Sequence, residues 1–212
     1  MTSQDYITIQ DTRVLMPSEW ERLRAAMITP EQHEIISTAI AIGDLSKANR
    51  IWRYQIICDM LLMTGMRIVE ATAMDPAWYR PSRRVVVVPK GAHKKVKCTF
   101  SERTVMLSTP GCDAVERYLA SGLSIIHKVP MRDALRRYAV KAGIGETGIT
   151  SKMFRKTLVS WLMACYPERE MYISASMGHD RSTLQKHYLG LGFPRSEVDL
   201  MREKYLKDWG VL

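Results

Sequence analysis

Five residues have side chains that could bind and attack a phosphate diester: Arg67, Lys152, Arg155, His179 and Tyr188. Two guanidinium groups can hold the non-bridging oxygens through paired hydrogen bonds, and a phenol can attack the phosphorus. The attack gathers negative charge on those oxygens, so fixed cations beside them stabilise the transition state. These residue types therefore indicate phosphoryl transfer.

The spacing of these residues would bring them onto rigid supports. Arg67 follows an apolar segment that ends at Gly65, so it starts a new helix. Lys152 and Arg155 lie three apart and share one helical face. Taken singly, such residues are usually ordinary: an ion pair at a helix start, a solvated helix face and a capping histidine.

Taken together, the motifs are similar to those of the tyrosine recombinase (phage integrase) family over roughly residues 15 to 190. That family combines an Arg in a Thr-Gly-x-Arg-x-x-Glu setting with a Lys on a β-hairpin, a His-or-Lys-x-x-Arg pair, a Gly-His pair and a Tyr nine residues later. In the same order, the sequence has Arg67 with Glu70, Lys90, Lys152 with Arg155, Gly178 with His179, and Tyr188.

The resemblance implies a role for each matching residue. Tyr188 would be the nucleophile and would form a 3′-phosphotyrosyl link, while Arg67 and Arg155 would clamp the scissile phosphate. Lys152 and His179 would hydrogen-bond that phosphate, and one of the two would help to deprotonate the phenol. Because the link conserves the energy of the phosphodiester bond, no nucleotide, metal or other cofactor is expected.

A basic connection between two predicted strands would supply the proton for the departing 5′ oxygen. Between Arg80 and Arg103 the sequence has eight Lys or Arg residues and one acid, Glu102. Lys90 is the expected general acid because of its position before Gly91. DNA backbone contacts are expected from the neighbouring basic residues Arg84, Lys94, Lys95 and Lys97.

Two features depart from the family pattern. Lys152 stands where His is commoner, and its ammonium must lose a proton if it is to act as a base; this variant suggests a mobile element of archaeal or viral origin. In addition, only about fifteen residues precede the expected start of the catalytic domain. We therefore expect a single catalytic domain over residues 1–212, without the N-terminal core-binding domain of other members.

Apolar periodicity and capping residues predict a mainly α protein with a small antiparallel β-hairpin, an α+β fold. The hairpin strands are expected at Arg84–Pro89 and Arg103–Leu107. Ser46 is the expected cap of the helix that ends at Gly65, and Thr150 or Ser151 of the helix carrying Arg155. The remaining helices are expected at about 17–27, 30–42, 109–119, 131–142, 171–177, 181–189 and 195–209.

The last of these helices has an apolar face that something must cover. Val198, Met201, Tyr205 and Leu206 recur at helical spacing. The segment 191–212 can pack on its own core, or it can be exchanged between protomers, as in the family's four-protomer DNA complexes. Both arrangements are open from the sequence, and self-association on DNA is expected.

Composition agrees with a folded, DNA-associated protein. Hydrophobic residues make up 46% and charged residues 25%, and the net charge of +9 favours a polyanionic partner, double-stranded DNA before a membrane surface. Cys58, Cys98, Cys112 and Cys165 show no zinc spacing and indicate a reduced, cytoplasmic setting. No signal pattern or membrane-spanning stretch is visible.

Three other classes of protein fit the sequence less well. A type IB topoisomerase-like enzyme or a telomere resolvase shares the same catalytic set, but the wording of the motifs and the length favour a recombinase. A non-catalytic DNA-binding regulator with the same fold is disfavoured because Tyr188 and both arginines are present. A metalloenzyme is disfavoured because no His and carboxylate cluster has ligand spacing.

Overall fold

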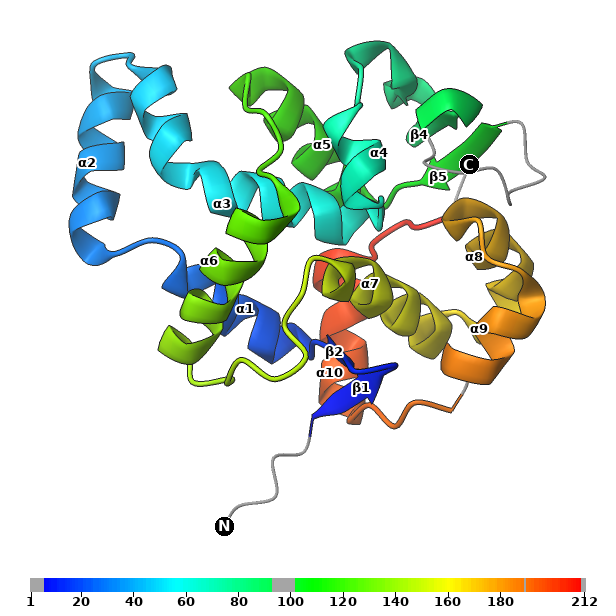
Figure 1. Ribbon diagram of the computed structural model, residues 1–212. Coiled ribbons are helices and arrows are strands. Elements are labelled where there is room, and N and C mark those ends of the chain that lie inside the picture. Colours follow the sequence, from blue (N-terminus) through cyan, green and yellow to red (C-terminus); the bar gives the residue numbers. More distant parts are fainter. Residues whose placement is uncertain (1–5, 93–101, 189, 211–212) are drawn as a thin grey trace.

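Helices dominate the structure, a computed structural model that describes residues 6–92, 102–188 and 190–210 (Figure 1). They are α1 (Pro17–Ala26), α2 (Pro30–Ala41), α3 (Leu45–Thr64), α4 (Ile68–Thr72), α5 (Thr109–Ser121), α6 (Lys128–Lys141), α7 (Lys152–Cys165), α8 (Glu170–Met177), α9 (Arg181–Tyr188) and α10 (Arg195–Leu200). The strands are β1 (Ile7–Ile9), β2 (Thr12–Val14), β3 (Tyr79–Arg80), β4 (Val85–Pro89) and β5 (Glu102–Met106). The predicted mainly α fold with small antiparallel sheets is confirmed.

Helix α3 is the central element of the core. Every residue from Gln55 to Thr64 is buried, and α5 and α7 pack against this helix. The prediction that Ser46 caps this helix was wrong. The N-cap is Asp44, whose side chain accepts a hydrogen bond from the Lys47 amide at 2.9 Å. The helix ends in a left-handed cap at Gly65 and delivers the chain to Arg67.

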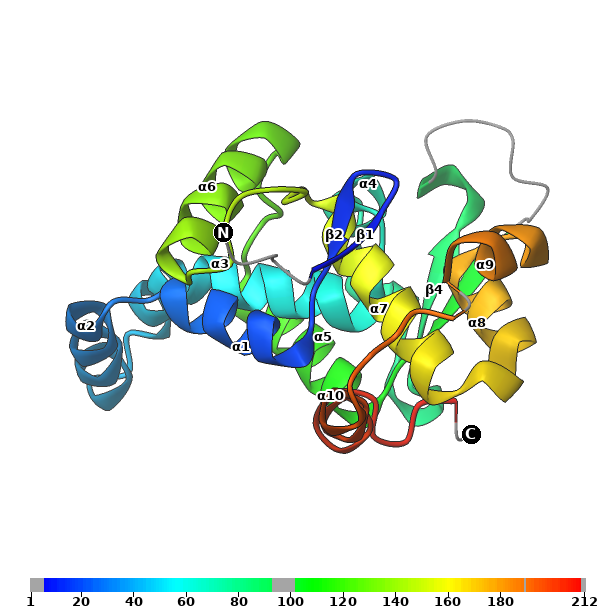
Figure 2. The ribbon, with the colours of Figure 1, turned by 90° about the horizontal axis from the view of Figure 1, so that it is seen from below.

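The predicted hairpin is present and has a third strand. β4 and β5 pair antiparallel, with Val86 opposite Val105, and the two-residue strand β3 pairs with the other edge of β4. The buried valines of β4 face the core, which explains why an apolar run was readable as a strand. The sheet lies beside α8 (Figure 2).

A second hairpin, β1–β2, was not predicted. Ile7 pairs with Val14 and Ile9 with Thr12, and the turn between them places Gln10 and Asp11 at φ values of +46° and +57°. Ile9 and Val14 are buried, and β2 packs on α7. The body of the protein therefore includes residues before the expected start near residue 15.

The C-terminal segment packs on the chain's own core. The expected continuous helix from Arg195 to Trp209 was wrong, because α10 ends at Leu200 and a π-helical turn follows over Met201–Tyr205. The indole of Trp209 is buried and donates a hydrogen bond to the Met106 carbonyl at 3.1 Å. Exchange of this segment between protomers stays a prediction.

None of the helices in the described part of the chain combines the length and the apolar character that crossing a lipid bilayer requires.

Candidate active site

Arg67 is positioned by the end of α3 and the start of α4. Gly65 has a φ of +58°, a left-handed conformation that favours glycine, and a Cβ there would come within 2.9 Å of the Met177 sulfur. Arg67 is the N-cap of α4, where its backbone amide and its Nη1 each donate to the Glu70 carboxylate at 2.8 Å. The Arg67 side chain is 43% exposed, so its guanidinium is held and still reachable.

Glu70 anchors more than one arginine. Its carboxylate is fully buried and also accepts a hydrogen bond from Arg103 on β5. Burial alone would raise the pKa of Glu70, but the charge of Arg103 and the hydrogen bonds from Arg67 outweigh burial and lower that pKa. Glu70 is therefore an ionised support under two guanidinium groups.

Arg155 points inward from α7 and is buried, so the alternative of a solvated arginine face was wrong. Its Nη1 donates to the Gly65 carbonyl at 2.9 Å, and its Nη2 donates to the Met177 carbonyl. Burial, together with the charges of Arg67 and Arg103, lowers the pKa of Arg155 to about 9. The guanidinium is thus rigid and still cationic at neutral pH.

His179 follows the left-handed cap of α8 at Gly178 and contacts Arg155. The Arg155 Nε donates toward His179 Nε2 at 3.4 Å, which requires the ring proton to be on Nδ1 when the imidazole is neutral. Burial, followed by the charges of Arg155, Arg67 and Arg103, lowers the pKa of His179 to about 3. At neutral pH the imidazole is therefore uncharged.

Tyr188 is the last residue of α9 and is buried beside His179. The two rings are stacked, with centroids 6.0 Å apart and planes at 18°. Burial raises the pKa of Tyr188, although the charge of Arg155 opposes that shift. The phenol is therefore protonated at neutral pH and needs a base before it can act as a nucleophile.

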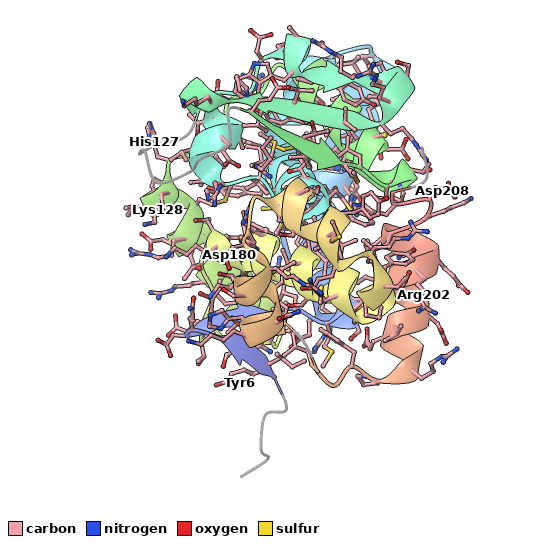
Figure 3. All side chains as sticks on the ribbon, turned by 90° about the vertical axis from the view of Figure 1, so that its right-hand side faces the viewer. Tyr6, His127, Lys128, Asp180, Arg202 and Asp208 are labelled. Atoms are coloured by element: carbon pink, nitrogen blue, oxygen red, sulfur yellow. The ribbon has the colours of Figure 1, made fainter. Side chains whose placement is uncertain are left out.

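The side chains of Arg67, Arg155, His179 and Tyr188 line one cleft with a volume of about 590 Å³. Of the described residues that line it, five carry cationic side chains and none carries a carboxylate. The cations are Arg67, Lys128, Lys152, Arg155 and Lys156. Lys152 is exposed at the start of α7. Lys128 is the first residue of α6, and Figure 3 labels it on the same side of the molecule as Asp180, the residue before α9. The cleft thus has the electrostatic character of an anion site.

Lys90 and Arg84 do not line this cleft. Lys90 is exposed in a short 3-10 turn after β4. Arg84 is half-buried, with its Nη1 3.4 Å from the Thr109 hydroxyl and 3.9 Å from the Asp208 carboxylate. Lys94, Lys95 and Lys97 lie outside the described residues.

Sequence reasoning missed Arg103, Lys128 and Lys156. Arg103 is buried because β5 alternates exposed and buried residues and places it on the same face as Val105. An arginine on the apolar face of a predicted strand is a usable signal of a buried ion pair. Lys128 and Lys156 had no motif, and only the folded arrangement brings them to the cleft.

Within the described ranges, no group of three or more His, Cys, Asp or Glu side chains is placed to hold a metal ion.

The fold matches solved structures, although the sequence matches no protein-family model and no curated protein. The XerA recombinase shares 16% identity with a TM-score of 0.52, and the match covers 89% of this chain and 63% of XerA. A Tn1549 transposon integrase fragment in complex with circular intermediate DNA shares 16% identity with a TM-score of 0.54, covering 82% and 66%.

The XerH site-specific recombinase bound to difH substrate shares 14% identity with a TM-score of 0.55. That match covers 80% of this chain and 48% of XerH, so the chain spans about half to two thirds of the length of these neighbours. At such identities the likeness concerns the fold. The described chain has the fold of the tyrosine recombinase catalytic domain.

Proposed function

We propose that the chain is a site-specific DNA recombinase or integrase that cleaves and rejoins strands through a 3′-phosphotyrosyl intermediate on Tyr188. One observation carries the proposal: Arg67, Arg155, His179 and Tyr188 line a single cleft with further cations and no carboxylate among its described lining residues. Two guanidinium groups can bind the non-bridging oxygens of a phosphodiester, and a phenol can attack its phosphorus.

Tyr188 would attack the scissile phosphorus, forming the bond between its phenol oxygen and phosphorus while the bond to the 5′ oxygen breaks. Arg67 and Arg155 would hold the non-bridging oxygens during this step. The buried Arg155 is fixed by two backbone carbonyls, so little reorganisation is needed as charge develops. Attack of the 5′ hydroxyl on the intermediate reverses the step and rejoins the strand.

The phenol proton would pass to His179 or to Lys152. His179 stacks on Tyr188 and is neutral at pH 7, but its Nε2 already accepts from Arg155, so His179 would take the phenol proton only once Nε2 is released from that contact. Lys152 lines the same cleft. The pH dependence of cleavage in His179→Gln and Lys152→Gln variants distinguishes the two: loss of the proton acceptor removes its limb of the profile.

The departing 5′ oxygen would receive a proton from the basic connection after β4, with Lys90 as the candidate. Lys90 is exposed and can approach a DNA duplex laid over the cleft. The neighbouring solved structures include an integrase and a recombinase bound to DNA, which supports DNA as the partner of this chain. Double-stranded DNA as its form and self-association on it stay predictions.

The test is covalent trapping on DNA. The protein is incubated in EDTA with a pool of nicked suicide duplexes that have randomised arms, so that the cleaved fragment is lost and rejoining is blocked. Wild type should give an adduct that survives denaturation, whereas Tyr188→Phe should bind the same duplexes without forming it. Binding by wild type with no adduct would support a non-catalytic DNA-binding protein instead.

A further inference from the structure

The tip of the β1–β2 hairpin contacts both helices that carry the proposed reacting groups. Lys156 on α7, next to Arg155, donates from Nζ to the Ile9 carbonyl. Gln10 Nε2 lies 3.3 Å from Nε2 of His187 on α9, next to Tyr188. Ile9 and Gln10 also line the cleft. Figure 1 shows the hairpin beneath α7 with its tip directed toward α9.

The base of this hairpin is firmly fixed. Arg13 is buried in an ion pair with Glu19, its Nη1 donates to the Ile144 carbonyl at 2.8 Å, and its backbone amide donates to the Gly148 carbonyl at 3.0 Å. The Leu15 amide donates to the Thr157 hydroxyl on α7 at 3.0 Å. The tip is therefore an extension of the core, able to hold another element in place.

Helix α9, by contrast, has little to hold it. It has eight residues, and of these only Leu184 and Tyr188 are buried. Like the Gln10–His187 contact, its described side-chain hydrogen bonds to α8 are exposed: Arg181 and Gln185 both reach Glu170, at 3.3 Å and 3.4 Å. A short helix with two buried side chains opens locally at low cost, so one added contact at its last turn has a measurable share in its position.

We propose that Gln10 is a positioning residue for the nucleophile, holding the last turn of α9 through His187 so that Tyr188 stays beside Arg155. The inference rests on the proposed function. Gln10 stands in the left-handed region, at φ +46°, where Asn and Gly are the usual residues. Its side chain, rather than its backbone preference, accounts for glutamine at this turn.

The amide of Gln10 suits this role whatever the protonation of His187. An amide has both a donor and an acceptor end, so it can donate to an unprotonated Nε2 or, after a flip, accept from a protonated one. The contact between hairpin and α9 is thus compatible with either tautomer of the His187 ring.

The decisive variant is Gln10→Asn, because asparagine retains the amide and tolerates the left-handed turn but is too short to reach His187. On duplex already bound, the first-order rate of adduct formation should fall roughly three- to tenfold, the worth of one hydrogen bond, while DNA affinity is unchanged. Thr8→Ala is the matched control, since Thr8 is exposed on the same hairpin. That variant should cleave at the wild-type rate.

Hydrogen exchange separates positioning from general stability and does not depend on cleavage. In Gln10→Asn the amides of residues 181–188 should exchange faster by a similar factor, while those of α3 keep their wild-type rates. In a His187→Ala background, Gln10→Asn should have no further effect on exchange or on cleavage, because the contact is already lost.

Unchanged exchange of α9 in Gln10→Asn, or equal additive effects of the two substitutions, would overturn the positioning role. If wild type forms no adduct, the proposed function is contradicted instead. The exchange measurement would still decide whether Gln10 holds the last turn of α9.

Discussion

Two cavities in the described part of the molecule differ in charge. The larger one, about 780 Å³, lies between α1, α3, α5 and the π-helical turn, and its described lining balances cations against carboxylates: Arg24, Arg117 and Lys204 against Glu21, Asp59 and Asp113. The smaller cleft, about 590 Å³, has five cations and no carboxylate among its described lining residues. Size therefore does not mark the site; unbalanced charge does.

The two cavities also share a motif, a buried carboxylate that holds half-exposed arginines. Asp59 pairs with the half-exposed Arg24 and Arg117 in the larger cavity, and Glu70, which does not itself line the cleft, pairs with the half-exposed Arg67 and the buried Arg103. Only the cleft adds a buried guanidinium, that of Arg155, whose partners are backbone carbonyls and His179. Since Glu70 is also the carboxylate that acts on Arg67 and Arg103, the guanidinium groups around it exceed its single charge, and the excess is left for an outside anion.

The largest expected effect comes from removing one arginine in each cavity. Arg67 and Arg117 are matched, with side chains 43% and 45% exposed and one buried carboxylate each. Arg67→Ala should slow adduct formation by roughly 10²- to 10³-fold, because a preorganised charge at the phosphate is lost. Arg117→Ala should change it by less than about twofold. A comparable loss in both would show that the charge difference has no catalytic meaning.

The supporting carboxylates should differ in their effect on folding. Glu70→Gln leaves cations buried against a neutral group and should lower the free energy of unfolding by about 3 kcal/mol. Asp59→Asn should cost about 1 kcal/mol, because its arginines reach solvent. Urea denaturation of both variants measures the difference, and equal losses would contradict the account.

The pKa of His179 predicts how stability depends on pH. Unfolded histidine has a pKa near 6.5, whereas the folded value is about 3. As the pH falls from 7 to 5, the unfolded chain takes up a proton that the folded chain does not, so wild type loses stability. The loss from this residue is at most about 2 kcal/mol at pH 5. His179→Gln should lack it; an unchanged pH dependence in denaturation would exclude the burial of a neutral imidazole.

The smallest effect concerns single lysines. Lys152→Gln in the cleft should reduce the slope of log affinity for DNA against log salt by about 1, since one phosphate contact and its counterion release are lost. Lys204→Gln in the larger cavity, where Lys204 pairs with Glu21, should leave the slope unchanged. A reduced slope for Lys204→Gln would indicate that DNA binds at the larger cavity and would contradict the account.

Local sequence patterns predicted the elements whose residues are neighbours along the chain. The Gly65 stop before Arg67, the helix carrying Lys152 and Arg155, and the β4–β5 hairpin all follow from short-range periodicity and caps. The β1–β2 hairpin was not predicted, because Gln10-Asp11 lacks the glycine or asparagine that usually marks such a turn.

Long-range pairing could not be read from the sequence. Nothing local to Arg103 indicates that it meets Glu70, and nothing local to Gln10 indicates that it meets His187. The prediction of one continuous last helix was wrong for a related reason. Its apolar spacing was correct, but the chain buries Leu206 and Trp209 on its own core by way of a π-helical turn.

The most direct test of the central claim is to identify the residue that becomes linked to DNA. Adduct trapped on a suicide duplex is digested with nuclease and trypsin, and the nucleotide-bearing peptide is sequenced by mass spectrometry. The account predicts the nucleotide on Tyr188, within the tryptic peptide of residues 187–195. A nucleotide on another residue, such as the exposed Tyr172, would contradict it.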